Sequence, residues 1–215
     1  QIIECKITSL EFENPIPQIS YSNDQDNIFD PVIPLPNILK LEKETIHIKN
    51  LDFKISPDEK DFFKNFDNLL KVSDIKFNSS AGHSIVFKKQ NLRFEEYKIK
   101  IKKDSISIEY SDYGGKFYSI ITLIQLINFY KTNLPLGLIE DRPALNWRGM
   151  HLDCARQFYT IDEIKRLMNY MCFFKLNRFH WHLTDNEAWR VELDCYPNLT
   201  KVGAFRGYDH TIPPF

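Results

Sequence analysis

The sequence predicts an α+β domain, an antiparallel sheet with helices, followed by the start of a (β/α)8 TIM barrel that is incomplete in this chain. Segments of alternating apolar and polar residues fill the middle of the chain, which is typical of half-buried strands. After residue 142, two short β-rich stretches flank one amphipathic helix, which is typical of a β–α–β unit. We therefore divide the chain into an N-terminal extension or linker (residues 1–30), the α+β domain (31–141) and the barrel start (142–215).

The composition is that of an ordinary globular protein. Hydrophobic residues make up 43% and charged residues 27%, and the net charge of −1 favours neither nucleic acid nor an acidic surface as a partner. No apolar run reaches the length of about 18 residues that a transmembrane helix needs, so no membrane span is expected. The chain begins with Gln1, which a processed signal peptide or a shortened chain would explain. The localisation is left open, with a slight preference for export to a periplasmic, secreted or lysosome-like location.

The four cysteines are Cys5, Cys154, Cys172 and Cys195, and no C-x-x-C spacing occurs, so zinc is not expected from them. Cys154 and Cys172 fall within a predicted strand and a predicted helix, which favours buried free thiols. A disulfide that involves Cys5 or Cys195 remains an alternative in an exported protein.

The N-terminal extension is polar, with an expected edge strand near residues 6–12 before a linker. In the α+β domain, Thr45–Lys49 alternates as a strand does. Ser56–Glu59 then combines a capping box with Pro at the first helical position. The helix that follows is expected to bury one aromatic face, formed by Phe62, Phe63, Phe66, Leu69 and Leu70.

Three further segments, Ser84–Lys88, Tyr97–Lys102 and Ser105–Tyr110, alternate cleanly and predict antiparallel strands, the last two joined by a tight turn. The basic run Lys98–Lys103 alternates with Ile, so it predicts a solvated strand face rather than a nucleic-acid patch. Inward-facing residues of these strands are expected in the core, namely Ile99, Ile101, Ile106 and Ile108.

A long apolar helix is predicted over Lys116–Lys131, after Gly114 and Gly115 end the sheet. Pro135 and Pro143 are expected to bracket a connector to the barrel start.

Thr160–Glu163 is a second capping box. The helix after it is expected to bury one face, formed by Ile164, Leu167, Met168, Met171 and Cys172. We assign its acidic pair, Asp162 and Glu163, to the helix N-terminus rather than to acid/base catalysis. Asp58 and Glu59 have the same explanation.

Two charged residues stand where the predicted barrel strands end. Arg156 ends the first and Asp185 the second, and in a (β/α)8 barrel these ends form the active-site face. A guanidinium can grip two neighbouring hydroxyls, and a carboxylate can accept from a sugar hydroxyl or orient a His. The alternative is an Arg156–Asp185 salt bridge at the barrel rim, and the residues alone favour neither. Asp153 has the opposite strand parity and is expected to face away from the substrate.

His180 and His182 share one strand face at a spacing that can bind a metal. Because no third ligand is evident, both are expected to pack in the barrel wall, and no metal or cofactor is expected. Trp181 is assigned to the core. Trp189 lies in a loop and is the better candidate for stacking on a sugar ring, although a structural role is favoured there too.

The segment Asn146–Gly203 resembles the start of the catalytic barrel of the β-N-acetylhexosaminidases, glycoside hydrolase family 20. The matching motifs are Trp147-Arg-Gly-Met-His-Leu-Asp-Cys-Ala-Arg156, Lys175-Leu-Asn-Arg-Phe-His-Trp-His-Leu-Thr-Asp185, Trp189-Arg-Val-Glu192, Tyr196-Pro-Asn-Leu-Thr200 and Val202-Gly-Ala204. The preceding domain is similar to the family's accessory α+β domain. Its matching motifs are Ile33-Pro-Leu-Pro36, Glu96-Tyr-Lys-Ile-Lys-Ile101, Gly115-Lys-Phe-Tyr118 and Thr122-Leu-Ile-Gln-Leu126. The resemblance covers about residues 31–210.

The resemblance implies hydrolysis of terminal β-linked N-acetylglucosamine or N-acetylgalactosamine with retention of configuration. A Glu is the general acid/base, and the substrate's own acetamido oxygen, oriented by an Asp, is the nucleophile. The resemblance also implies that Arg156 binds the ring hydroxyls and that Asp185 joins the network that supports the acid/base Glu. The family often has Asp-Asp where this chain has Asp185-Asn186, so no role is carried over to Asn186.

The resemblance places the catalytic Asp-Glu pair on a later strand that this chain lacks, so no catalytic residue is assigned within it. Two strands cannot close a barrel, and the chain alone is therefore expected to be inactive. Its expected partners are an N-acetylhexosamine-containing glycan and the remaining part of the barrel, from the same or another chain. The alternatives are a non-catalytic carbohydrate-binding or assembly module, which solvent-facing aromatic residues on the first domain's sheet would favour, and a different barrel hydrolase.

Overall fold

The computed structural model describes residues 30–64, 66, 75–78, 82–186 and 188–205. The chain forms two compact units. The sheet unit comprises described residues 30–146 and 172–175, and the strand-pair unit comprises 147–171 and 176–205. The expected strand near residues 6–12 lies outside the described residues, as do Leu69 and Leu70.

The sheet unit contains a seven-stranded mixed sheet in the order β1-β7-β5-β6-β4-β2-β3. The strands are β1 (Ile38–His47), β2 (Asp52–Lys54), β3 (Lys76–Asn78), β4 (His83–Lys89), β5 (Tyr97–Ile101), β6 (Ser105–Tyr110) and β7 (Asn133–Asp141). The β5–β6 pair is antiparallel as predicted, but β4 pairs with β6 in parallel, so the fully antiparallel sheet was a wrong prediction. The alternation of apolar and polar residues shows which face of the sheet a side chain occupies. It is the same in parallel and antiparallel strands, so it does not predict the direction of pairing.

The expected connector between Pro135 and Pro143 is instead largely strand β7, which lies between β1 and β5. Pro135 pairs with Thr45 just where the register of β1 shifts, a position at which a missing N–H is tolerated. The backbone of β1 also approaches Gly137 closely, because a Cβ there would lie 2.2 Å from Lys40 O. Pro135 and Gly137 therefore both fit an inner strand.

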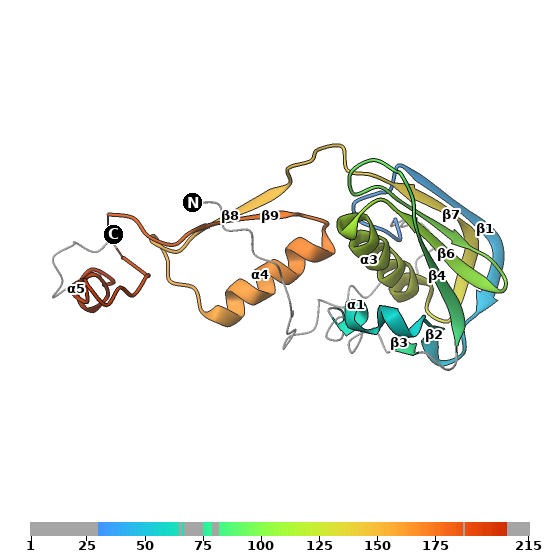
Figure 1. The fold of residues 1–215 in the computed structure, drawn as a ribbon, viewed down its shortest axis with the longest axis horizontal. Coiled ribbons are helices and arrows are strands. Elements are labelled where there is room, and N and C mark those ends of the chain that lie inside the picture. The colour runs from blue at the N-terminus through green and yellow to red at the C-terminus, as the bar shows by residue number, and fades with distance from the viewer. Residues whose placement is uncertain (1–29, 65, 67–74, 79–81, 187, 206–215) are drawn as a thin grey trace, which may run out of the picture. The chain divides into compact units, whose positions relative to one another are not determined.

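Helix α3 (Tyr113–Tyr130) packs on one face of this sheet, as Figure 1 shows. It begins before the predicted Lys116, because the Asp112 side chain accepts from the N–H of Gly115 (2.9 Å) and caps the helix. Gly115 is therefore in the first turn, where a Cβ would lie 2.6 Å from Glu96 O. The core between helix and sheet includes the four isoleucines expected there, Ile99, Ile101, Ile106 and Ile108.

The predicted aromatic helix lies partly outside the described residues, and its described part starts irregularly. A 3₁₀ turn (η2, Pro57–Glu59) precedes α1 (Lys60–Lys64), and the Ser56 hydroxyl contacts Asp58 rather than a helix N–H. Of the predicted aromatic face, Phe63 and Phe66 are buried and Phe62 is half-buried, and the rings of Phe63 and Phe77 have centroids 4.2 Å apart. Another short 3₁₀ turn, η1, covers Lys49–Leu51.

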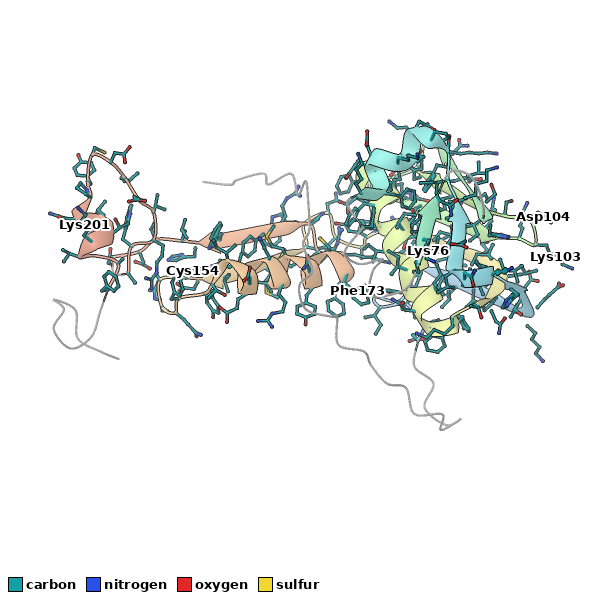
Figure 2. All side chains as sticks on the ribbon, turned by 90° about the horizontal axis from the view of Figure 1, so that it is seen from below. Lys76, Lys103, Asp104, Cys154, Phe173 and Lys201 are labelled. Atoms are coloured by element: carbon teal, nitrogen blue, oxygen red, sulfur yellow. The ribbon has the colours of Figure 1, made fainter. Side chains whose placement is uncertain are left out.

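The basic run lies on a strand face, as predicted, and three of its lysines form ion pairs there. Lys98 lies 3.0 Å from Glu140, and Lys103, labelled at the tip of the β5–β6 hairpin in Figure 2, lies 2.6 Å from Glu44. These pairs offset part of the basic charge of the run.

The strand-pair unit is built on a parallel pair, β8 (Gly149–Asp153) and β9 (Arg178–His182), with α4 (Ile161–Phe173) between them in sequence. The predicted capping box is present, with Thr160 N donating to Glu163 Oε2 (2.8 Å) and Glu163 N donating to Thr160 Oγ1 (3.3 Å). A short helix α5 (Asn198–Lys201) follows. The β–α–β prediction is confirmed for this segment (Figure 1). Among the described residues, no helix combines the length and apolarity needed to cross a membrane.

Candidate functional site

The strand-pair unit brings Arg156 and Asp185 together at one edge of its sheet. Strand β8 ends at Asp153 and β9 at His182. Because the two strands are parallel, the segments that follow them leave the sheet at the same edge. The Arg156 guanidinium forms an ion pair with Asp185 Oδ2. The salt bridge that the sequence left as an alternative is therefore present. The Arg156 side chain is 55% exposed, so the pair is also reachable from solvent.

His182 joins this pair. Its Nε2 lies 3.1 Å from Asp185 Oδ2 and 3.4 Å from Arg156 Nη1. An ionised carboxylate only accepts hydrogen bonds, and a guanidinium only donates them. The shorter contact, to Asp185, therefore assigns the proton of the neutral ring to Nε2 and leaves Nδ1 as its acceptor atom.

Asp153 belongs to the same cluster: it satisfies neighbouring polar groups, as the strand parity predicted, but it is not turned away from Arg156. Its Oδ1 accepts from the backbone N–H of Ala155 (2.9 Å) and of Arg156 (3.2 Å), and its Oδ2 lies 3.3 Å from Arg156 Nη1. The chain turns directly after Asp153, so the alternation of a straight strand does not extend to Arg156. Arg156 is consequently held between two carboxylates.

The carboxyl groups of Asp153 and Asp185 both have pKa values below the ordinary value. The N–H of Asn186 and then the Arg156 side chain lower the pKa of Asp185. Burial acts to raise the pKa of Asp153, but the backbone N–H groups of Arg156 and Ala155 outweigh it and lower that pKa. At neutral pH both groups are therefore ionised acceptors. They can bind hydroxyl or guanidinium donors but have no proton to give to a leaving group.

Of the two tryptophans near the cluster, Trp181 differs from its predicted place, whereas the contacts of Trp189 agree with the structural role favoured for it. Trp181 was assigned to the core but is 43% exposed, and its Nε1 donates to Cys154 Sγ (3.1 Å). Cys154 directly follows β8 and is labelled in Figure 2. Trp189 is half-buried and donates from Nε1 to Val191 O (2.5 Å), which ties the ring to its own loop.

A second group of side chains lies on the face of this pair that carries His182. His151, His180 and His182 place potential metal-ligating atoms within 4.8 Å of one another. The sequence singled out only His180 and His182 and missed His151. The missing signal was the strand register, since His151 pairs directly with His180. Without that register, His151 is one of many polar residues in a strand.

The comparisons with known proteins agree in both parts of the chain. Residues 30–142 match the model of glycosyl hydrolase family 20, domain 2, and residues 145–212 match that of the glycosyl hydrolase family 20 catalytic domain. A β-hexosaminidase of Vibrio furnissii is 42% identical over 120 residues, which are 55% of this chain and 20% of the relative. An N,N'-diacetylchitobiase of Vibrio harveyi is 39% identical over 114 residues, 53% of this chain and 13% of the relative. The chain thus spans a fifth or less of these relatives.

Solved structures show the same relationship. The family 20 exo-β-N-acetylglucosaminidase of Vibrio harveyi, solved in complex with N-acetylglucosamine, superposes with a TM-score of 0.74 at 35% identity, over 86% of this chain and 30% of that one. A β-N-acetylhexosaminidase of Bacteroides fragilis gives a TM-score of 0.66 at 29% identity, over 81% of this chain and 37% of that one. The mixed sheet with its helices therefore matches the fold of these enzymes, and the chain belongs to glycosyl hydrolase family 20.

Proposed function

We propose that this chain supplies the accessory domain and the first two barrel strands of a β-N-acetylhexosaminidase, which hydrolyses terminal β-linked N-acetylglucosamine or N-acetylgalactosamine with retention of configuration. The observation that carries the proposal is the cluster of Arg156, Asp185 and His182 where two parallel strands end. In (β/α)8 enzymes this end of the strands holds the active site. The names of the relatives give the substrate class.

Arg156 is the proposed sugar-binding residue. Two carboxylates hold its guanidinium, which fixes its direction, and more than half of its side chain is exposed. A guanidinium has five donors, so it can keep its ion pairs and also donate to neighbouring ring hydroxyls. Asp185 has the supporting role: it orients Arg156 and His182 and remains ionised.

The proton donor is proposed to be a Glu on a later strand, next to the Asp that orients the substrate's acetamido group. Support comes from Asp153 and Asp185, whose lowered pKa values exclude them as acids at neutral pH. The described residues provide two parallel strands at this site, and closing a barrel of this kind takes eight. We therefore propose that the chain is inactive alone and active when the remaining barrel completes it.

The proposed organisation is an extension over residues 1–30, the accessory domain over 31–141 and the barrel start over 142–215. The non-catalytic carbohydrate-binding alternative would need aromatic residues on the outer face of the sheet. On β5 that face carries Lys98 and Lys100, which pair with Glu140 and Glu109. This ionic surface favours the enzyme.

The test is release of a chromogenic group from a β-N-acetylglucosaminide, with the intact mass of the protein recorded in parallel. The 215-residue chain is expected to be inactive, and a longer polypeptide that carries the rest of the barrel is expected to be active. Turnover by the 215-residue chain would refute the assignment of the acid to a later strand. Glycan binding without hydrolysis by the longer polypeptide would instead favour the carbohydrate-binding alternative.

Arg156→Ala in the longer polypeptide tests the sugar contact. Loss of charged hydrogen bonds to the substrate is expected to lower kcat/KM by roughly 10- to 150-fold. Arg142→Ala is the matched control, because Arg142 is an exposed arginine of the sheet unit. Equal kcat/KM values for Arg156→Ala and Arg142→Ala would show that Arg156 does not contact the substrate.

A further inference from the structure

We propose that His151, His180 and His182 bind a divalent transition-metal ion. The three residues come from both strands of the β8–β9 pair, and their potential ligating atoms lie within 4.8 Å of one another. This inference goes beyond the proposed sugar chemistry and shares only His182 and Asp185 with that site.

The register of the two strands creates the cluster. His151 pairs with His180, and Asp153, two residues further along β8, pairs with His182. Because side chains alternate along a strand, His151, His180 and His182 all project from one face of the pair. The rings of His151 and His180 have centroids 4.6 Å apart, and those of His151 and His182 5.7 Å apart. The backbone thus holds the three rings together before any ion binds.

The spacing suits a small ion after minor side-chain rotation. Zinc–nitrogen bonds of about 2.0–2.1 Å at a tetrahedral angle place two ligand nitrogens about 3.3 Å apart. The three histidine atoms, within 4.8 Å of one another, would have to close by at most about 1.5 Å to reach this geometry. Rotation about the imidazole side-chain torsions covers such a distance without moving the strands.

The carboxylate of Asp185 prepares His182 as a ligand. It accepts from His182 Nε2 (3.1 Å), so Nδ1 of the neutral ring carries the lone pair that a metal needs. Metal-binding histidines commonly donate their second ring N–H to a carboxylate in this way, which orients the ring and strengthens its ligand atom. Asp153 and Asp185 together also outnumber the positive charge of Arg156 beside the site. The local charge therefore favours a cation.

Three imidazoles define the class of ion. Nitrogen ligands suit zinc, cobalt, nickel and copper, whereas calcium and magnesium prefer oxygen. A set of three protein ligands leaves a coordination position for water, which solvent can reach because His151 and His180 are exposed and His182 is half-buried. The site is therefore expected to bind Zn²⁺ or Co²⁺ and not to bind Mg²⁺.

The first experiment titrates Co²⁺ into the untagged 215-residue chain and follows the visible absorption bands of the ion, with Zn²⁺ as competitor. The expected result is one saturable Co²⁺ site that Zn²⁺ displaces and Mg²⁺ does not. His151→Leu and His180→Leu are each expected to weaken binding by at least about tenfold. His47→Leu is the matched control, because His47 is an exposed histidine of β1 in the sheet unit.

A second measurement needs no variant and so does not depend on the variants folding. In an NMR spectrum of the imidazole nitrogens, Zn²⁺ is expected to shift the signals of His151, His180 and His182 and to leave those of His47 and His83 in place. Binding that survives both His151→Leu and His180→Leu, or Zn²⁺ shifts confined to other histidines, would overturn the proposal. Absence of any saturable Co²⁺ binding would overturn it as well.

Asp185→Asn tests the link between the ion and the carboxylate. Removal of such a supporting carboxylate typically lowers metal affinity by about 10- to 100-fold. Asp162→Asn is the control, because Asp162 lies in the first turn of α4. An Asp185→Asn variant with unchanged Co²⁺ affinity would show that Asp185 does not prepare His182 for the ion.

Discussion

The ammonium group of Lys175 lies 2.8 Å from Asp141 Oδ2, and both side chains are almost fully buried within the sheet unit. The Tyr97 hydroxyl lies 2.8 Å from the same ammonium group and 2.9 Å from the same carboxylate oxygen. It also contacts Thr122 Oγ1 at 2.6 Å. Burial, and then the charge of Asp141, raise the pKa of Tyr97 well above its usual value, so the hydroxyl stays neutral and can donate to the carboxylate. The network is thus hydrogen-bonded throughout.

Replacement of Lys175 by Met should destabilise the protein strongly. The variant leaves the buried Asp141 carboxylate without its cation, and removal of one partner of a buried ion pair costs about 3–5 kcal/mol. The measurement is the free energy of unfolding from urea titrations. Lys98→Met is the matched control, since its half-exposed pair with Glu140 should contribute at most about 1 kcal/mol. Similar losses in both variants would contradict the role given to burial.

The C-terminal end of α4, near Lys175, was not predicted from the sequence. The 3.6-residue periodicity and the capping box located α4 correctly, because both are local signals. The C-terminal end of α4 is a left-handed turn in which Lys175 N bonds to Cys172 O and Leu176 N to Met171 O, with Lys175 at φ 59°. Glycine usually occupies this position, so the sequence gives no stop signal. Here the residue is also a partner of Asp141, which is distant in sequence.

The same limit applies to the candidate site. Arg156 and Asp185 could be found from the sequence because each follows a recognisable strand, and the end of a parallel strand is a predictable place for a site. Asp153 was misplaced because the strand alternation stops at the turn after it, and His151 was overlooked because its partner is set by the pairing of two strands. Strand direction and register are properties of the assembled sheet, and hydrophobic alternation along a single strand does not encode them.

The Asp185 carboxyl group should titrate below its ordinary pKa of 3.8. A lowered pKa in the folded state means that folding favours the charged form, so the stabilisation is present above about pH 3.9 and is lost as the pH falls through the lower folded pKa. Carbon-13 NMR of the carboxyl group measures the midpoint. Arg156→Gln should raise that midpoint without restoring the ordinary value, because the Asn186 N–H remains. Arg166→Gln, on α4, is the control and should leave the Asp185 midpoint unchanged. A midpoint unaffected by Arg156→Gln would argue against the Arg156–Asp185 ion pair.

Replacement of Thr160 by Ala should destabilise α4 modestly. It removes the hydroxyl that accepts from Glu163 N (3.3 Å) and donates to Glu163 Oε2 (2.9 Å), but keeps the backbone N–H that donates to Glu163 Oε2. Loss of such a cap costs about 0.5–2 kcal/mol. Urea unfolding measures it. Thr160→Ser keeps the hydroxyl and should be close to the parent, so equal losses for Ala and Ser would mean that the methyl group matters and the cap does not.

The thiols of Cys195 and Cys172 should differ sharply in reactivity. Cys195 is exposed, whereas Cys172 is buried in the last turn of α4, and burial raises the pKa of its thiol to about 12. Only the thiolate attacks an alkylating reagent, so at about pH 8 roughly one Cys172 side chain in 10⁴ is reactive, and the reagent must also reach it. Peptide mass spectrometry after a short treatment with iodoacetamide should therefore find Cys195 modified and Cys172 intact. Addition of urea should abolish the difference, because unfolding returns both thiols to water. Equal labelling of the two residues in the native protein would show that the C-terminal turn of α4 opens on the time scale of the reaction.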